Sequence, residues 1–238
     1  VTGDIVLDIE AGQNKVIMWD CLADLGPFTA ATTRVRVRVN DRNMPWYREG
    51  MYYIPEGSFI MGDTRDEGSD DERPTNNVDV SAFYMDEHEV SNEDMRGVMQ
   101  WAYDEGKVYK QSYGIVDGFN RTLLEFSESW CQLGWSGDTI VVEEGKENYP
   151  CSEVSWPGAM AYCTYKNEME GREQSVNYAW DITVNWSSNG YRLATEAEWE
   201  RAARGGYAGT RFPWHDVEWI AHTRANYDSV QPGGSPWY

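Results

Sequence analysis

Thiol side chains are the first candidates for chemistry in this chain, because a thiolate is both a nucleophile and a ligand for soft metal ions. The cysteines are Cys21, Cys131, Cys151 and Cys163. None of them forms a C-x-x-C pair, and with three histidines in the chain no zinc-finger spacing can be written. The spacing leaves two states open: a disulfide such as Cys131–Cys151, or buried free thiols.

A run of acids is the second candidate, in the segment D-T-R-D-E-G-S-D-D-E-R at residues 63–73. Calcium prefers such oxygen ligands, but a calcium loop of the type D-x-[DN]-x-[DN]-G with a glutamate at position twelve is not present here. Serine-nucleophile chemistry has no support either, because nothing resembles the G-x-S-x-G turn. We therefore expect the acidic segment to be a solvated surface loop.

Composition narrows the classes of partner. The net charge of the chain is −20, from 40 acidic and 20 basic residues. An acidic surface repels phosphate backbones, which argues against a nucleic-acid partner. No apolar run reaches the length of about 20 residues that spans a bilayer, so no membrane span is predicted. Hydrophobic residues make up 41% and aromatic residues 14% of the chain, which favours an aromatic-rich and irregular globular fold.

The chain divides into two regions of different pattern. The first contains short apolar runs and, at residues 34–39, the alternating stretch R-V-R-V-R-V, all of them typical of strands. A complete immunoglobulin-type sandwich needs about 100 residues. We therefore interpret residues 1–42 as the end of a β-sandwich-like domain, followed by a short linker and a second domain over residues 46–238.

Strands and loops alternate in the first part of the second domain. The stretch M-Y-Y-I-P-E-G-S-F-I-M-G predicts a hairpin that turns at Pro55-Glu56-Gly57. An alternating, strand-like stretch follows the acidic loop, at N-N-V-D-V-S-A-F-Y-M-D. Between Gly106 and Pro150 the one convincing strand is T-I-V-V-E-E.

Three helices are expected in the second domain, each with a side chain that can cap its start. Ser91 and Ser155 precede apolar stripes of helical period, and Pro157 suits the first turn of the second helix. Thr195 and Glu198 form a T-x-x-E capping box for the third. The expected helices lie near residues 91–104, 156–168 and 196–204.

The last of these helices has the clearest ends. A glycine pair at Gly205-Gly206 suits the left-handed position that closes a helix. Trp199 and the alanines of A-E-W-E-R-A-A-R provide an apolar stripe. We therefore expect this helix to pack against a neighbouring element through that stripe.

Five blocks of the chain resemble, in type and order, those of the formylglycine-generating enzyme family, also called the sulfatase-modifying factor domain. The similarity extends from about residue 46 to the end. It implies an α+β, C-type lectin-like fold with small twisted antiparallel sheets, two or three helices and long loops. The blocks are I-P-E-G-S-F-I-M-G-D, then D-E-R-P with V-D-V-S-A-F-Y-M-D-E-H-E-V-S-N-E-D-M, then P-C-S-E-V-S-W-P-G-A-M-A-Y-C-T-Y, then N-G-Y-R-L-A-T-E-A-E-W-E-R-A-A-R-G-G, and R-F-P-W-H-D with R-A-N-Y.

The resemblance also implies where the family's oxidation chemistry lies. Active members carry two cysteines, further along than these blocks, that bind copper(I) and oxidise a substrate cysteine to formylglycine. A soft copper ion requires thiolates held close together. None of the four cysteines here falls on those motif positions, so we assign no catalytic residue and expect a domain truncated at its C-terminal end. Copper is expected only if a missing C-terminal part carries the cysteine pair, and Cys163 matches a family cysteine whose partner lies in that part.

A calcium site is implied as well. In the family, an asparagine shortly after the F-P-W segment and the backbone carbonyl of the next residue contribute to it. The stretch R-A-N-Y-D places Asn226 and Tyr227 there, with Asp228 adjacent. Calcium takes about six to eight oxygen ligands. The alternative is that Asn226 caps a loop.

These observations lead to one expected function and two alternatives. We expect a lectin-like-fold domain of a secreted or surface protein, extracellular, on the cell surface or periplasmic, with a binding or architectural role and no catalysis. Its partners would be a protein or carbohydrate ligand and further domains or chains of the same protein. The first alternative is a fragment of a copper-dependent formylglycine-generating oxidase that matures sulfatases. The second, a sulfoxide synthase of ergothioneine type, is disfavoured because the three histidines do not form its H-x-x-x-H-x-E motif.

Overall fold

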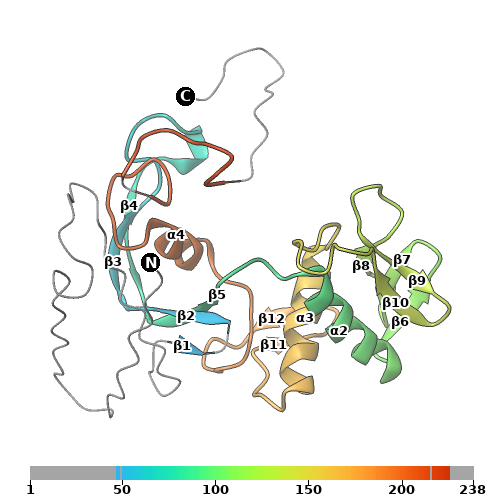
Figure 1. The fold of residues 1–238 in the computed structure, drawn as a ribbon. Coiled ribbons are helices and arrows are strands. Elements are labelled where there is room, and N and C mark those ends of the chain that lie inside the picture. The colour runs from blue at the N-terminus through green and yellow to red at the C-terminus, as the bar shows by residue number, and fades with distance from the viewer. Residues whose placement is uncertain (1–46, 49, 215, 226–238) are drawn as a thin grey trace, which may run out of the picture. The chain divides into compact units, whose positions relative to one another are not determined.

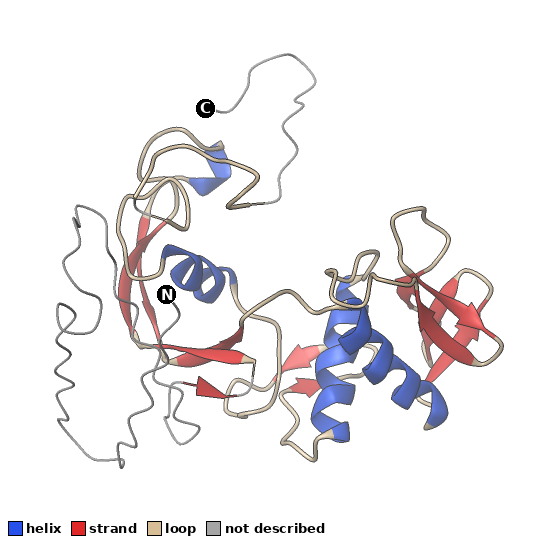
Figure 2. Ribbon diagram, viewed as in Figure 1, coloured by secondary structure: helices blue, strands red, loops and turns tan. Residues whose placement is uncertain are grey.

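The structure, a computed structural model, describes residues 47–48, 50–214 and 216–225 (Figure 1). All of them belong to one unit of the chain, Asp41–Tyr238. They form an α+β arrangement of small antiparallel sheets and three α-helices joined by long loops, as Figure 2 shows. The expected fold class is therefore confirmed. The strands expected within residues 1–42 lie outside the described residues and stay a prediction.

All three predicted helices are present, with ends that agree to about one residue. Ser91, Ser155 and Thr195 are their N-caps. Each side-chain oxygen accepts from the backbone N–H three residues later, at 3.1, 3.0 and 3.2 Å. None of the three described helices is both long and apolar enough to cross a membrane. The helices are α2 (Asn92–Asp104), α3 (Trp156–Met169) and α4 (Glu196–Arg204).

The predicted hairpin at Pro55-Glu56-Gly57 is wrong, because the strands on its two sides do not pair with each other. Ile54 lies opposite Phe83, and Gly57 lies opposite Val80 in the same antiparallel register. Pro55 has no N–H to donate to a ladder, so the turn residues interrupt one long antiparallel ribbon instead of reversing it. The ribbon consists of β2 (Met51–Ile54) with β5 (Phe83–Asp86), then β3 (Gly57–Met61) with β4 (Asn76–Val80).

The segment between α2 and α3 contains more strands than its sequence indicates. T-I-V-V is a strand as predicted, but four further strands accompany it. Each is four residues long, which is too short for its alternation to be distinguished from loop sequence. They are β6 (Val108–Gln111), β7 (Gly114–Asp117) and β8 (Thr122–Glu125) in one sheet, and β9 (Leu133–Ser136) paired with β10 (Thr139–Val142).

Smaller elements complete the described part of the chain. They are β1 (Tyr47–Arg48) beside β2, the short 3-10 helix η1 (Asp70–Glu72), and the pair β11 (Val176–Asn177) and β12 (Thr183–Val184).

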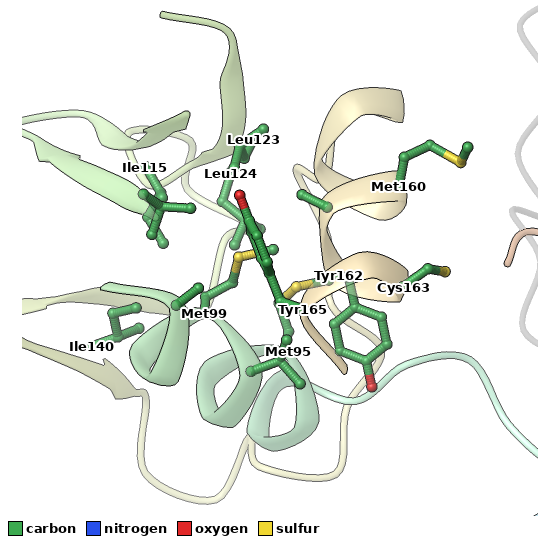
Figure 3. Close-up of a cluster of buried hydrophobic side chains, with 14 of the residues drawn as sticks. Met95, Met99, Ile115, Leu123, Leu124, Ile140, Met160, Tyr162, Cys163 and Tyr165 are labelled. Atoms are coloured by element: carbon green, nitrogen blue, oxygen red, sulfur yellow. The ribbon is translucent and has the colours of Figure 1, made fainter. Parts of the chain in front are cut away.

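The hydrophobic core lies where α2 and α3 meet the strands between them (Figure 3). The apolar stripe predicted for α2 is buried as expected. Gly158 brings α3 close to β8, since a Cβ there would lie 2.0 Å from the carbonyl oxygen of Leu123. The core includes Met95, Val98, Met99 and Ala102 of α2, Met160, Tyr162 and Tyr165 of α3, and Ile115, Leu124 and Ile140 of the strands.

A buried amide anchors the loop that precedes α4. Asn167 of α3 is 0% exposed. Its side chain accepts from the N–H of Tyr191 at 2.7 Å and donates to the carbonyl of Tyr191 at 3.0 Å. Gly190 permits this approach, because a Cβ there would lie 2.0 Å from the carbonyl oxygen of Glu173. Both backbone groups of Tyr191 are thus satisfied without a neighbouring strand.

Helix α4 is held by polar contacts, contrary to the expected apolar stripe. Trp199 is 65% exposed, and the buried residue of the helix is Glu198. The Glu198 carboxylate accepts from both terminal nitrogens of Arg192, at 2.7 and 2.6 Å, and from the N–H of Thr195 at 2.8 Å. Arg201 donates to the carbonyl oxygen of Pro55, at the break in the ribbon. Charge pairing thus replaces apolar burial along this helix.

Glu198 is expected to make stability depend on pH. Burial raises its pKa, but the hydrogen bonds from Arg192 and Thr195 outweigh burial, so its pKa lies below the ordinary value of 4.5. The unfolded chain then binds more protons in acid, so this stabilisation is present above about pH 4.5 and is lost as the pH falls through the folded pKa. Glu198→Gln should lower the free energy of unfolding by about 1–3 kcal/mol at pH 7. In urea unfolding series at several pH values, the gap between the two proteins should narrow below about pH 4.5. A gap that stays constant down to acid pH would contradict this role of the carboxylate.

Candidate functional site

The predicted calcium ligands belong to the segment that follows the F-P-W motif. Asn226, Tyr227 and the adjacent Asp228 lie outside the described residues. In the segment before them, Arg224 pairs with Asp216 at 2.7 and 2.8 Å. Within the described ranges, no group of three or more His, Cys, Asp and Glu side chains could hold a metal ion. The calcium site therefore stays a prediction.

The acidic loop between β3 and β4 is organised by hydrogen bonds and ion pairs. Asp63 accepts from the backbone N–H groups of Gly68 and Arg65, both at 2.9 Å, and these bonds lower the pKa of its carboxyl group. Arg73 pairs with Asp66 and, at 3.1 Å, with Asp70. These carboxylates are engaged by internal donors, so the loop is structured. The Asp63 side chain is only 6% exposed, whereas the other acids of the loop are exposed as expected.

An open pocket of about 390 Å³ lies beside α3 and the β11–β12 pair. Its lining mixes amides, a hydroxyl, a carboxylate and one phenol ring. Gln174 donates from Nε2 to the carbonyl of Thr164 at 3.2 Å, while its Oε1 is buried and has no hydrogen-bond partner among the described residues. The polar lining residues are Thr164, Glu168, Gln174, Asn177, Tyr178 and Asn185.

The buried carboxylate of Asp117 pairs with Arg121 and also binds Tyr178, a residue of the pocket lining. The Asp117 carboxylate accepts from the Tyr178 hydroxyl at 2.9 Å, from Arg121 Nε at 2.7 Å and from the N–H of Phe119 at 2.9 Å. Burial raises the pKa of Asp117, but these donors outweigh it and the net pKa is lowered. Burial and the bond to Asp117 raise the pKa of Tyr178. At neutral pH Asp117 is therefore a carboxylate and Tyr178 a neutral phenol, which suits positioning of the pocket wall and not proton transfer.

The described thiols lack the lowered pKa of a catalytic nucleophile or of a copper(I) ligand. Cys131, Cys151 and Cys163 carry no disulfide in this structure. Burial raises the pKa of Cys151 and Cys163 to about 12, and raises that of Cys131 as well. Such thiols are protonated at neutral pH, whereas a nucleophile or soft-metal ligand must be a thiolate. The residues present therefore do not fit a copper(I) site, and the family partner expected for Cys163 stays a prediction.

Sequence reasoning missed the pocket, because residues 170–189 read as loop. A weak signal was present: Val176 and Tyr178 alternate with polar residues, as do Ile182 and Val184, around the turn at Asp181. Val176 is a buried core residue, and the other three of these apolar side chains pack against the core. The two strands are only two residues long, so their alternation is too short to be recognised in a sequence window of ordinary length.

Comparison with known proteins places these features in a family. The sulfatase-modifying factor enzyme 1-like domain matches residues 39–234. The formylglycine-generating enzyme of Mus musculus is 32% identical over 69% of this chain and 42% of its own length. The inactive C-alpha-formylglycine-generating enzyme 2 of Mus musculus is 29% identical, over 69% and 50%. The formylglycine-generating enzyme of Streptomyces coelicolor is 28% identical, over 72% and 52%.

Among solved structures, that of CarF is similar with a TM-score of 0.44 and 20% sequence identity, covering 67% of this chain and 57% of that one. The chain spans about half the length of the curated relatives it matches. The family match covers most of the chain and agrees with the order of the motif blocks. The chain therefore belongs to the sulfatase-modifying factor enzyme 1-like domain family.

Proposed function

We propose that the described part of this chain is a binding module of a secreted or surface protein, and that its ligand is a neutral saccharide held at the pocket beside β11 and β12. The observation that carries the proposal is the lining of that pocket. Three amides and a hydroxyl line it together with the ring of Tyr178 and one carboxylate, that of Glu168. Such groups donate to and accept from ligand hydroxyls, while the ring covers an apolar face.

The hairpin that borders the pocket is held rigidly. Arg121 donates to the carbonyl oxygens of Ala179 and Trp180, at 3.1 and 3.3 Å. Trp180 is 73% exposed and packs edge to face with Phe119, with ring centroids 6.0 Å apart. A fixed, exposed indole beside polar groups provides a stacking surface at low cost in conformational entropy. The net charge of −20 disfavours an anionic ligand.

A second candidate function is favoured by the similarity to enzymes. The mouse relative named formylglycine-generating enzyme is 32% identical to this chain. Another mouse relative of similar identity is named inactive, so similarity to this chain occurs both in a protein named as an enzyme and in one named inactive. The thiols of Cys131, Cys151 and Cys163 have raised pKa values and do not match the family's copper-binding positions. We therefore place an enzymatic role second.

Binding of a saccharide is tested with an array of neutral oligosaccharides, followed by calorimetry with the best one. Asn177→Ala combined with Asn185→Ala removes two amides of the pocket lining. We expect the affinity to fall about tenfold or more, because each lost hydrogen bond to a hydroxyl contributes about 1 kcal/mol. Asn189→Ala, an exposed amide outside the pocket lining, is the matched control and should bind as wild type. An array on which no neutral oligosaccharide binds would reject the proposal.

Enzymatic activity is tested separately. This chain, incubated with copper and oxygen, should not convert a C-x-P-x-R peptide to formylglycine, because its described thiols are protonated at neutral pH. Mass spectrometry of the peptide detects the aldehyde, and the Streptomyces coelicolor enzyme serves as positive control. Aldehyde formed by this chain would favour the second candidate function over the first.

Calcium binding is the third part of the proposal. We expect Asn226 and the backbone carbonyl of Tyr227 to contribute two oxygen ligands, since calcium requires hard oxygen donors. Calorimetric titration of calcium into the wild type and into Asn226→Ala should show a loss of affinity of about tenfold or more in the variant. Equal affinities would remove Asn226 from the site.

A further inference from the structure

Cys131 and Cys151, whose pairing the sequence leaves open, lie in two loops that are connected by hydrogen bonds. Cys131 precedes β9, and Cys151 lies between β10 and α3. The Ser152 hydroxyl donates to the carbonyl of Trp130 at 2.9 Å. The indole N–H of Trp130 donates to Glu153 at 2.6 Å. The residue before Cys131 is therefore bound to the two residues after Cys151.

A second connection lies on the other side of the cysteines. Asn92 of α2 is 1% exposed. Its side chain donates to Gln132 Oε1 at 2.7 Å, and its backbone N–H donates to the carbonyl of Tyr149 at 2.9 Å. The residue after Cys131 and a residue just before Cys151 thus share one buried anchor. With contacts on both sides, the two segments that carry Cys131 and Cys151 are held next to each other.

The sulfurs themselves occupy similar environments. Both side chains pack against the hydrophobic core. Cys131 Sγ lies 3.8 Å from the carbonyl oxygen of Leu133, and Cys151 Sγ lies 3.7 Å from that of Ser152. Burial raises the pKa of Cys151, and the proximity of Cys131 raises it further. Cys131 is therefore close enough to Cys151 to affect the pKa of the Cys151 thiol.

Cys163 is set apart from this pair. It lies on α3 and is 6% exposed. Figure 3 shows Cys163 and Met160 on the opposite side of α3 from Leu123 and Leu124. Burial raises the pKa of Cys163, and the nearby charges that affect this pKa most are those of Asp86, Lys166 and Arg192.

We propose that Cys131 and Cys151 form an intramolecular disulfide when the folded chain meets a small-molecule disulfide such as oxidised glutathione. At mildly alkaline pH a small fraction of one protein thiol loses its proton, and this thiolate attacks a glutathione sulfur, which breaks the glutathione S–S bond and releases one reduced glutathione. The other protein thiolate then attacks the mixed disulfide and releases the second. The two protein thiols lose two protons and two electrons, and glutathione disulfide is reduced to two thiols.

The cross-link would have a mechanical effect and a chemical one. It would close the loop that contains β9 and β10 and tie it to the start of α3. Closing a loop of this size restricts the unfolded chain, which stabilises the folded state. Thiolates that burial destabilises are poor leaving groups, so the disulfide should resist reduction once formed.

The experiment maps disulfides in the folded chain. Reduced protein is incubated with oxidised glutathione at about pH 8, quenched in acid, and alkylated under denaturing conditions. Mass spectrometry of a non-reduced digest should find the peptides of Cys131 and Cys151 joined, with Cys163 alkylated. Recovery of Cys131 and Cys151 as alkylated thiols, or as separate glutathione adducts, overturns the proposal.

Variants provide a second readout. Oxidation should raise the Tm of the wild type by about 5 °C or more, and that of Cys163→Ala by a similar amount. Cys151→Ser should show no rise, because the Cys131–Cys151 cross-link can no longer form. A rise that persists in Cys151→Ser would assign the stabilisation to another cysteine pair and overturn the proposal.

Discussion

The buried amide of Asn167 is the contact on which the path of the loop before α4 depends. It satisfies both backbone groups of Tyr191, in a place where no strand is available to do so. A buried backbone N–H or carbonyl without a partner costs about 1–3 kcal/mol, so the loop has one strongly favoured path across α3. Gly190 is required by the same path, since any side chain there would collide with the carbonyl of Glu173.

Directly after Tyr191, a second polar contact holds the chain: the ion pair of Arg192 with Glu198. Arg192 and Glu198 form a bidentate pair, and Glu198 also completes the capping box of α4. One carboxylate thus fixes both the start of the helix and the loop before it. This explains how α4 is held although Trp199 remains 65% exposed. Removing one partner of such an ion pair leaves the other charge partly buried and unpaired. The free energy lost in this way is larger than the net contribution that the intact pair makes to stability.

A buried carboxylate also positions residues at the pocket, in this case that of Asp117. Asp117 gathers donors from Arg121, Tyr178 and the backbone, and Arg121 in turn holds the turn that carries Trp180. A tyrosine committed to a carboxylate is rigid and is not poised for proton transfer at neutral pH. The arrangement is suited to recognition by shape and hydrogen bonding, which is the basis of the proposed saccharide site.

Structural features that depend on residues close together in the sequence, such as the helix starts, could be predicted from the sequence alone. The caps at Ser91, Ser155 and Thr195 act on residues three positions later, and the helices therefore begin where predicted. The motif blocks identified the family for the same reason, because each is a short local pattern. The expected ligands Asn226 and Tyr227 rest on that similarity and not on geometry.

Features determined by distant residues required the tertiary structure. The Pro55-Glu56-Gly57 signal is compatible with a hairpin or with a break in a ribbon, and only the pairing of Ile54 with Phe83 decides between them. The pocket joins α3 to a hairpin of two-residue strands, and the closeness of Cys131 to Cys151 depends on contacts that cross between loops. Such pairings are chosen by the summed energy of many long-range contacts, which no local window of the sequence contains.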